Sequence, residues 1–251
     1  MSKRKPIPHR SEGPRPTGGL WIYGDHAVRA ALANPHRQRH RLLVAGELPS
    51  PIPAGVTPEK VDRTAIDSLL PRGAVHQGLA LNVGRLPRQD IEVLLDVPRG
   101  EKAVAIMLDQ VTDPHNVGAV LRSAAAFGAK GVVVQDRHAP EESGALAKAA
   151  SGALETVPLL RTNNLSRALD ELRESGWWAV GLAHDAAMTI EQARDREKVI
   201  LVLGAEGAGM RRLVREHCDL VVAIPMDGSA VASLNVSNAA AIALYVMSQA
   251  R

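Results

Sequence analysis

A single carboxylate stands inside a glycine-rich stretch in the last fifth of the chain. Glu206 lies within residues 204–209, Gly-Ala-Glu-Gly-Ala-Gly, directly after the apolar run 199–203. Glycines let a backbone approach a ligand closely, and a carboxylate in such a loop can bind a cation or orient an arginine. The alternative is an ordinary tight turn that the carboxylate caps.

A second apolar run, 220–224, stops at Pro225 and is followed by a loop and a helix of small residues over about 235–249. Each apolar run is predicted to be a strand that releases a loop at its end. Two such loops beside each other at the carboxyl edge of an α/β sheet are typical of a ligand crevice. We therefore expect both loops to border one binding site.

The first helix of the C-terminal part carries a polar amide near its start. The spacing of apolar residues predicts a helix over 114–127, with Asp113 as N-cap and Pro114 at the first helical position. Asn116 lies in the first turn, where its amide can bond to another loop. The free N–H groups and the dipole of this helix end suit an anion.

His115, Gly118 and Arg122 share one face of that helix because of their spacing. Gly118 is expected to leave this face open to a bulky group. Arg122 is either a residue of the site or a solvated mid-helix side chain, and His115 is either an acid or base or a surface residue. The helix alone favours the second interpretation for both.

Strands and helices alternate from residue 103 onward. Such alternation predicts an α/β fold with a largely parallel sheet that is covered on both faces. The predicted strands are 104–108, 131–134, 156–160, 178–182, 199–203 and 220–224, and the predicted helices are 114–127, 143–150, 165–174 and 235–249.

The first hundred residues predict three segments. Residues 1–18 are basic and proline-rich and predict a disordered arm, which is either a solubilising tail or a segment that tracks RNA phosphate. Residues 19–84 predict a small α/β domain, and residues 85–102 predict a linker. Within the small domain we expect strands over 21–23, 41–45 and 79–83, and helices over 26–33, capped by Asp25, and 64–70.

Basic residues cluster before the second predicted strand of the small domain. A solvated loop is the simpler interpretation, and a surface that contacts RNA phosphate is the other. The isoelectric point of about 9.2 permits nucleic-acid binding, but the net charge of +3 means that any basic surface is local. The few aromatic residues disfavour a base-stacking platform. The cluster consists of His36, Arg37, Arg39, His40 and Arg41.

Cys218 is the single cysteine, which excludes an intrachain disulfide and a zinc site built on several cysteines. His184, His217 and Cys218 form no recognisable ligand pattern, so no metal is expected. Neither a signal peptide nor an apolar run of membrane-spanning length is visible. We therefore expect a cytoplasmic protein without a membrane segment.

Three ordered stretches, 113–123, 203–207 and 224–226 with 233–237, resemble the motifs of the SpoU (TrmH-type) RNA ribose methyltransferases of the SPOUT superfamily. They read DPHNVGAVLRS, LGAEG, and IPM with SLNVS, and the resemblance covers about residues 103–251. Ile22-Tyr23-Gly24 and His76-Gln77-Gly78-Leu79-Ala80 resemble the small, L30e-like substrate-binding domain that precedes the catalytic domain in members acting on ribosomal RNA. The resemblance is strongest to members that methylate a guanosine 2′-hydroxyl of 23S ribosomal RNA.

The resemblance implies S-adenosylmethionine as cofactor, RNA as substrate, a homodimer and a deep C-terminal trefoil knot, which pattern analysis alone would not predict. It implies catalytic roles for Asn116, Arg122, Glu206, Ser233 and Asn235. It implies that the cofactor is held largely by backbone at Leu203, Gly204, Gly207, Ile224, Met226 and Leu234. Two departures from the family pattern are a loop 227–232 that is one residue longer than usual, and Asn238 in place of a commonly apolar residue.

Arg122 is assigned by the resemblance to activating the ribose hydroxyl. A neutral arginine is hard to justify, since its pKa lies above about 12. We therefore favour Arg122 as a charge partner of the developing alkoxide and the adjacent phosphate, and the base role stays open. Glu206 and Asn116 would position it, while Ser233 and Asn235 would fix the loop and the donor.

The sequence thus predicts an RNA 2′-O-methyltransferase. The alternatives are a transfer-RNA substrate, a catalytically silent RNA-binding or ribosome-assembly protein, and a nucleotide-dependent oxidoreductase. The last is disfavoured because no G-x-G-x-x-G follows the first strand of the α/β part. The final helix is apolar nearly all round, so we expect a second copy of the chain to cover one side of it, at Ala240 and Ala243 among others.

Overall fold

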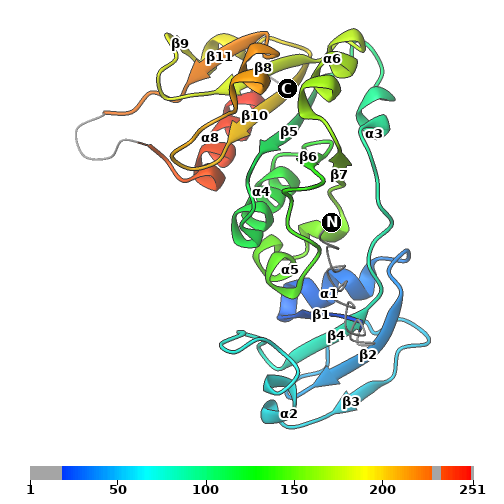
Figure 1. Cartoon of the computed structure of the whole chain (residues 1–251). Helices are drawn as coiled ribbons and strands as arrows, with labels where there is room; N and C mark the ends of the chain where they lie inside the picture. Colours follow the sequence, from blue (N-terminus) through cyan, green and yellow to red (C-terminus); the bar gives the residue numbers. More distant parts are fainter. Residues whose placement is uncertain (1–18, 228–232, 250–251) are drawn as a thin grey trace, which may run out of the picture.

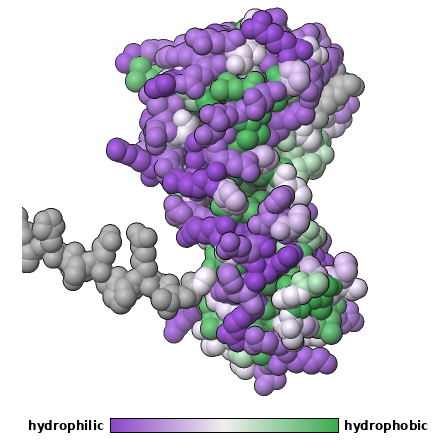
Figure 2. Space-filling view, turned by 90° about the vertical axis from the view of Figure 1, so that its right-hand side faces the viewer, coloured by the Kyte–Doolittle hydropathy of each residue, from purple (hydrophilic) through white to green (hydrophobic). Residues whose placement is uncertain are grey.

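Two β-sheets form the framework of the protein, one at the bottom and one at the top of Figure 1. The computed structural model describes residues 19–227 and 233–249. The smaller sheet has the strand order β1-β4-β2-β3, and the larger has the order β7-β6-β5-β10-β8-β11-β9. The molecule narrows between the two (Figure 2). The arm predicted over 1–18 lies outside the described residues.

The smaller sheet is mostly antiparallel, because β4 pairs antiparallel with β1 and β2 while β3 runs parallel to β2. We predicted that Asp25 is the N-cap of the first helix, but Asp25 is the first residue of that helix. The chain leaves β1 through Gly24 at φ 89°, a left-handed conformation that glycine tolerates, and Asp25 pairs with Arg29. The elements are β1 (Leu20–Tyr23), α1 (Asp25–Ala33), β2 (Arg39–Val44), β3 (Pro58–Lys60), α2 (Arg63–Asp67) and β4 (Leu79–Val83).

The larger sheet is parallel at every strand pair described, which confirms the predicted α/β class. Its elements are β5 (Ala103–Asp109), α4 (Pro114–Ala126), β6 (Val132–Gln135), α5 (Gly144–Ala150), β7 (Leu159–Thr162), α6 (Leu165–Glu174), β8 (Trp178–Leu182), β9 (Met188–Thr189), β10 (Lys198–Gly204), α7 (Arg212–Glu216), β11 (Leu220–Ala223) and α8 (Val236–Ser248), with short 3₁₀ helices at Ala153–Glu155 and Ile190–Ala193.

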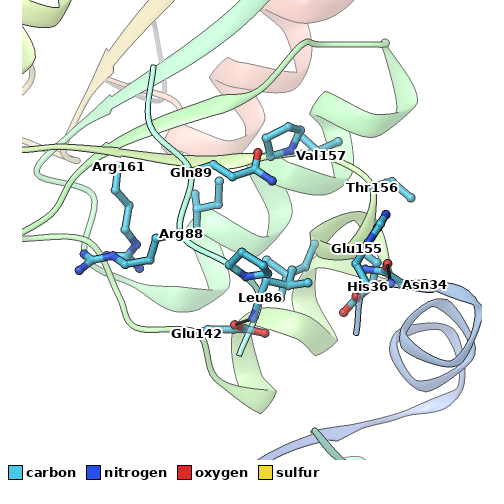
Figure 3. A pocket seen from close by; sticks show the side chains of 14 residues that line it. Asn34, His36, Leu86, Arg88, Gln89, Glu142, Glu155, Thr156, Val157 and Arg161 are labelled. Atoms are coloured by element: carbon cyan, nitrogen blue, oxygen red, sulfur yellow. Dashed lines mark hydrogen bonds between the residues drawn. The ribbon is translucent and has the colours of Figure 1, made fainter. Parts of the chain in front are cut away.

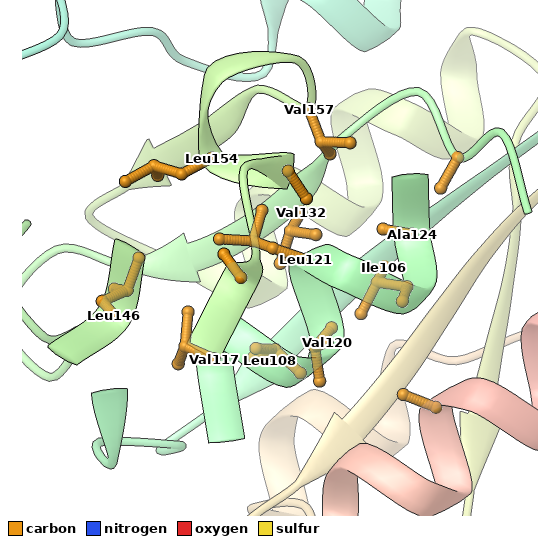
Figure 4. Close-up of a cluster of buried hydrophobic side chains, with 14 of the residues drawn as sticks. Ile106, Leu108, Val117, Val120, Leu121, Ala124, Val132, Leu146, Leu154 and Val157 are labelled. Carbon is orange, nitrogen blue, oxygen red and sulfur yellow. The ribbon is translucent and has the colours of Figure 1, made fainter. Parts of the chain in front are cut away.

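Alternate side chains of the buried strands serve two separate cores. Ile106 and Leu108 of β5 pack with α4, α5 and α8, as Figure 4 shows for α4. Ala105 and Met107, which point to the other face, pack with α6, α7 and α3 (Glu92–Leu95). Because successive strand residues face opposite sides, a strand buried on both faces must be largely apolar, as β5 is up to its last residue, Asp109.

The strands β10 and β11 are not neighbours in the sheet, although we expected the loops after them to lie side by side. Strand β8 lies between β10 and β11 and pairs with both. The three strands are parallel, so their carboxyl ends still lie along one edge of the sheet. Both loops therefore reach the same edge, but one strand apart.

The segment predicted as a linker, 85–102, packs on the larger sheet. It contains α3, whose Leu94 is fully buried, and the indole Nε1 of Trp177 donates to the Leu94 carbonyl at 3.0 Å. Gln89 forms an isolated parallel bridge with Leu160 of β7. The domain boundaries themselves remain a prediction.

Arg37 belongs to the basic cluster that was interpreted as either a solvated loop or an RNA-contacting surface. It fits neither interpretation, because it connects the two sheets. Its guanidinium is fully buried and donates to Glu142 and Glu155, each at 2.5 Å, and to the Gly84 carbonyl at 2.9 Å. Burial lowers the pKa of Arg37, but the hydrogen bonds and charges of Glu155 and Glu142 outweigh it and raise that pKa overall. Arg37 therefore holds the smaller sheet on the segment before α5, through Glu142, and on the 3₁₀ helix after α5, through Glu155.

Beside this ion pair lies a cavity of about 410 Å³ between the segment 86–89 and residues 154–161. Figure 3 shows His36, Asn34 and Glu155 at one end of it and Arg88 and Arg161 at the other. Its lining includes none of the site residues predicted from the sequence.

Candidate active site

Three polar side chains from distant segments meet at the carboxyl edge of the larger sheet. Asn116 Nδ2 donates to Glu206 Oε1 at 3.1 Å. Asn235 Nδ2 donates to Asn116 Oδ1 at 3.1 Å and to Glu206 Oε1 at 2.5 Å. The three side chains thus form a closed triangle, in which one carboxylate accepts two charge-assisted hydrogen bonds.

Local structure places each member of the triangle. The Asp113 side chain caps α4 by accepting a hydrogen bond from the His115 N–H at 2.9 Å. Because the helix begins at this cap, Asn116 lies in its first turn. Asn235 caps α8, since its Oδ1 accepts from the Ser237 N–H at 2.9 Å. One end of the Asn235 amide is thereby used by the helix, and the Nδ2 end is directed at Glu206.

Arg122 and Ser233 are not part of the triangle. Arg122 is exposed on α4, six residues beyond Asn116, and makes no hydrogen bond or ion pair within 19–227 and 233–249. Ser233 is exposed just before the α8 cap. Glu206 therefore orients two amides rather than an arginine, and the expected positioning of Arg122 by Glu206 and Asn116 is absent from the described contacts.

We had expected Gly118 to leave one face of α4 open, but α5 fills that space. A Cβ built on it would lie 2.6 Å from Ala149 Cβ and 2.7 Å from the Leu146 carbonyl oxygen, both on α5. The missing side chain is what lets α5 pack closely on α4. Gly118 therefore serves helix packing.

The predicted cofactor residues lie in and beside the two loops. Leu203 is buried near the end of β10. Gly204, the last residue of that strand, packs against the backbone of Gly209, so that a Cβ added to Gly204 would lie 1.9 Å from the Gly209 carbonyl carbon. Gly207 is exposed, has a φ of 77° and faces open space. Beyond β11, Ile224 and Leu234 are half-buried and Met226 is exposed.

Sequence reasoning missed Asp109 and Arg211, which meet directly behind the Glu206 loop. The Asp109 carboxylate is fully buried and accepts from the Arg211 N–H and from its Nε, both at 2.8 Å. The available signal was a carboxylate at the end of a strand, β5, whose seven residues are all buried. A buried charge requires a partner, so Asp109 was bound to have one.

The described part of the chain holds no group of three His, Cys, Asp or Glu side chains placed to bind a metal ion. Within those same residues, no helix is both long and apolar enough to cross a membrane.

A parallel sheet with polar loops gathered around Glu206 at its carboxyl edge defines an α/β protein, a class in which ligands typically bind at that edge. Residues 103–245 match the SpoU rRNA Methylase family. The chain therefore belongs to the SpoU rRNA methylase family, as the resemblance predicted.

Several relatives cover nearly the whole chain. The 23S rRNA (guanosine-2′-O-)-methyltransferase RlmB of Vibrio cholerae is 42% identical over 240 residues, which are 89% of this chain and 94% of that protein. RlmB of Escherichia coli K12 is 41% identical, over 89% of this chain and 96% of its own. A tRNA/rRNA methyltransferase of Synechocystis is 38% identical over 89% of this chain, which spans only 61% of that longer protein.

Solved structures share the fold. The SpoU methyltransferase AviRb of Streptomyces viridochromogenes, in complex with AdoMet, superposes with a TM-score of 0.76 and 25% identity, over 92% of this chain and 90% of that one. A structure described as an RNA 2′-O ribose methyltransferase gives a TM-score of 0.74 and 26% identity, over 92% and 88%.

Proposed function

We propose that this protein transfers a methyl group from S-adenosylmethionine to the 2′-hydroxyl of a guanosine in 23S ribosomal RNA. The observation that carries the proposal is the triangle of Asn116, Glu206 and Asn235, one residue from each of the three family stretches. The substrate rests on the two RlmB relatives, which this chain matches over almost their full length.

The residues of the two loops fit this cofactor. Gly207 presents bare backbone to open space, Ile224 and Leu234 offer half-buried apolar side chains, and Glu206 offers an exposed carboxylate next to them. Bare backbone and apolar side chains suit an adenosine, and a carboxylate suits a cation. S-adenosylmethionine supplies an electrophilic methyl group on a sulfonium cation.

Arg122 is the cation that we assign to the reacting ribose. Its exposure on α4 leaves the cationic guanidinium accessible to RNA. A fixed positive charge stabilises the alkoxide that develops as the hydroxyl loses its proton, and it also attracts the adjacent phosphate. Asn116, Glu206 and Asn235 hold their loops together, and Ser233 precedes the cap that fixes α8.

Three further proposals complete the description. The smaller sheet, as an L30e-like domain of residues 19–84, supplies affinity for RNA. A second copy of the chain covers the exposed side of α8, which gives a homodimer. Action on ribosomal RNA would place the protein in the cytoplasm.

We also propose a trefoil knot in the C-terminal part. It is supported by β10, which inserts between β5 and β8, and by α8, which comes back from beyond β11 to pack with β5 side chains. A chain trace through residues 224–236 in an experimental structure would decide the matter, and an unthreaded path would exclude the knot.

The test is methyl transfer to defined RNAs. Purified protein is incubated with methyl-labelled S-adenosylmethionine and either 23S ribosomal RNA or transfer RNA, and the product nucleosides are identified by mass spectrometry. We expect 2′-O-methylguanosine in the ribosomal RNA alone. Methylation of transfer RNA alone would overturn the substrate, and donor binding without transfer to any RNA would favour the catalytically silent protein.

A further inference from the structure

A buried carboxylate behind the Glu206 loop is held by an arginine from the end of that loop. Asp109, the last residue of β5, is fully buried, and one of its oxygens accepts from the Arg211 main-chain N–H at 2.8 Å. The other accepts from Arg211 Nε at 2.8 Å and lies 2.7 Å from the second guanidinium nitrogen. Arg211 is therefore fixed to Asp109 through both main chain and side chain.

The hydrogen bonds continue across the edge of the sheet. The Arg211 guanidinium donates to Gln135 Oε1 at 2.7 Å, and Gln135 Nε2 donates to the Asn163 carbonyl at 3.1 Å. Asp109, Gln135 and Asn163 lie at or just after the carboxyl ends of β5, β6 and β7. The network thus ties the segment that follows β10 to three other strand ends.

The loop 205–210 is fixed by this network at its far end. It folds back on itself through the Gly209 N–H, which donates to the Ala205 carbonyl at 2.8 Å. Its tip, Glu206, is held by Asn116 and Asn235, whereas Arg211, the residue after the loop, is held by Asp109. Without the second anchor, a loop with two glycines at positive φ, Gly207 and Gly209, would have many conformations open to it.

We propose that Asp109, Arg211 and Gln135 are positioning residues, which hold the loop 205–210 in its donor-binding conformation before the donor arrives. The inference rests on the proposed function, since it takes this loop to border the S-adenosylmethionine site. Holding the loop in advance removes the entropy loss of ordering it from the binding step, which strengthens binding.

The experiment compares Arg211→Met, Asp109→Asn and Gln135→Met with a control, Arg212→Met. Arg212 is adjacent in sequence but exposed, and it pairs only with Glu216 of its own helix among the described residues. Gln135→Met removes the two side-chain hydrogen bonds of a half-buried residue, those with Arg211 and Asn163, and leaves no charge unpaired. It therefore keeps the test valid if the other two variants fold poorly. Hydrogen exchange of the Gly209 amide is measured without donor, and donor affinity is measured by calorimetry without RNA.

We expect exchange at Gly209 to accelerate about tenfold or more in the three variants, and donor affinity to fall by about tenfold in Arg211→Met and Asp109→Asn, as for loss of a hydrogen bond to a charged group. The amide of Ile106, which is paired to Gly131 in the sheet, should be unchanged in Gln135→Met, and Arg212→Met should match the wild type. A uniform acceleration at Gly209 and Ile106 would mean a purely structural role and overturn the inference. An unchanged exchange rate of the Gly209 amide in the three variants would also overturn it, as would an unchanged donor affinity in Arg211→Met and Asp109→Asn. If the wild-type protein binds no donor, the proposed function has failed, and the donor-free exchange still reports whether the network orders the loop.

Discussion

The side-chain amide of Asn116 donates to Glu206 across 90 residues of sequence, at 3.1 Å. Asn235 donates to the same carboxylate oxygen. Glu206→Gln keeps the shape but removes the charge, and charge-assisted hydrogen bonds are roughly twice as strong as neutral ones. We expect methyl transfer to fall by about tenfold, and further in Glu206→Ala, in a single-turnover assay. Glu216→Gln, an exposed carboxylate on α7, is the control and should retain full activity.

Arg122→Ala should reduce methylation by about a hundredfold or more, as expected for loss of a group that stabilises developing charge. The free energy of unfolding should change by less than about 0.5 kcal/mol, because Arg122 is exposed and has no partner among the described residues. Donor affinity should stay close to wild type. Lysine at this position should also be poor, because it lacks the planar guanidinium. A collapse of donor affinity in step with activity would remove Arg122 from the role proposed here.

Elements with strong local signals were predicted at their observed bounds. Helix α6 has an apolar stripe, begins at an Asn164 cap and ends before a glycine, and β8 is a short apolar run. Strand β3 and helices α3 and α7 were missed, since they span only three to five residues and depend on tertiary contacts. The triangle joins three residues that the family resemblance had identified. The first-turn position of Asn116 predicted a bond to another loop, which its hydrogen bond to Glu206 confirms, but the bonds of Asn235 were not predicted.

Buried charges were the main failure of sequence reasoning. Arg37 lies among basic residues that suggested solvent or RNA, yet its partners, Glu142 and Glu155, are more than 100 residues away. Gly118 looked like an opening in a helix face, but α5 fills that space. Such outcomes depend on which elements pack together, and helical or strand periodicity carries no information on that.

Arg37→Met should destabilise the protein by about 3–5 kcal/mol, because it leaves the nearly buried Glu155 without its cation. Arg41→Met is a matched control from the same cluster. Arg41 pairs with Glu59 at the surface, where solvent screens the ion pair, so its removal should change the free energy of unfolding far less. Unfolding in urea measures both. Equal effects of the two substitutions would show that the buried ion pair does not hold the two sheets together.

Cys218 should resist alkylation in the folded protein. Burial raises the pKa of its thiol to about 12, so only about one thiol in ten thousand is ionised at pH 8. The unfolded thiol, with an ordinary pKa, releases its proton more readily than the folded one, so the free energy of unfolding should fall as the pH rises from about 9 towards 12. Iodoacetamide labelling at pH 8, with and without denaturant, tests the first point. Cys218→Ala should weaken the pH dependence, and equal labelling rates in both states would contradict the burial of the thiol.

The last prediction concerns the side of α8 that its own chain leaves open. Ala240 and Ala243, which we had expected at a contact between copies, are fully buried within the chain, so glutamate there tests folding instead. Ile242 and Tyr245 are the exposed apolar residues of α8, at 38% and 53%, and the Tyr245 ring meets Phe127 of the same chain edge-on.

A second copy that covers this side would bury both side chains on the helix that the Asn235 cap begins. Ile242→Glu places a charge in that contact and should give monomers with lost methyl transfer but an unchanged far-ultraviolet circular dichroism spectrum. Leu213→Glu, at an exposed apolar residue of α7, is the matched control and should leave the dimer intact. Light scattering alongside the methyl-transfer assay measures both properties. A wild-type protein that is monomeric and active, or an Ile242→Glu dimer, would rule out α8 as the interface.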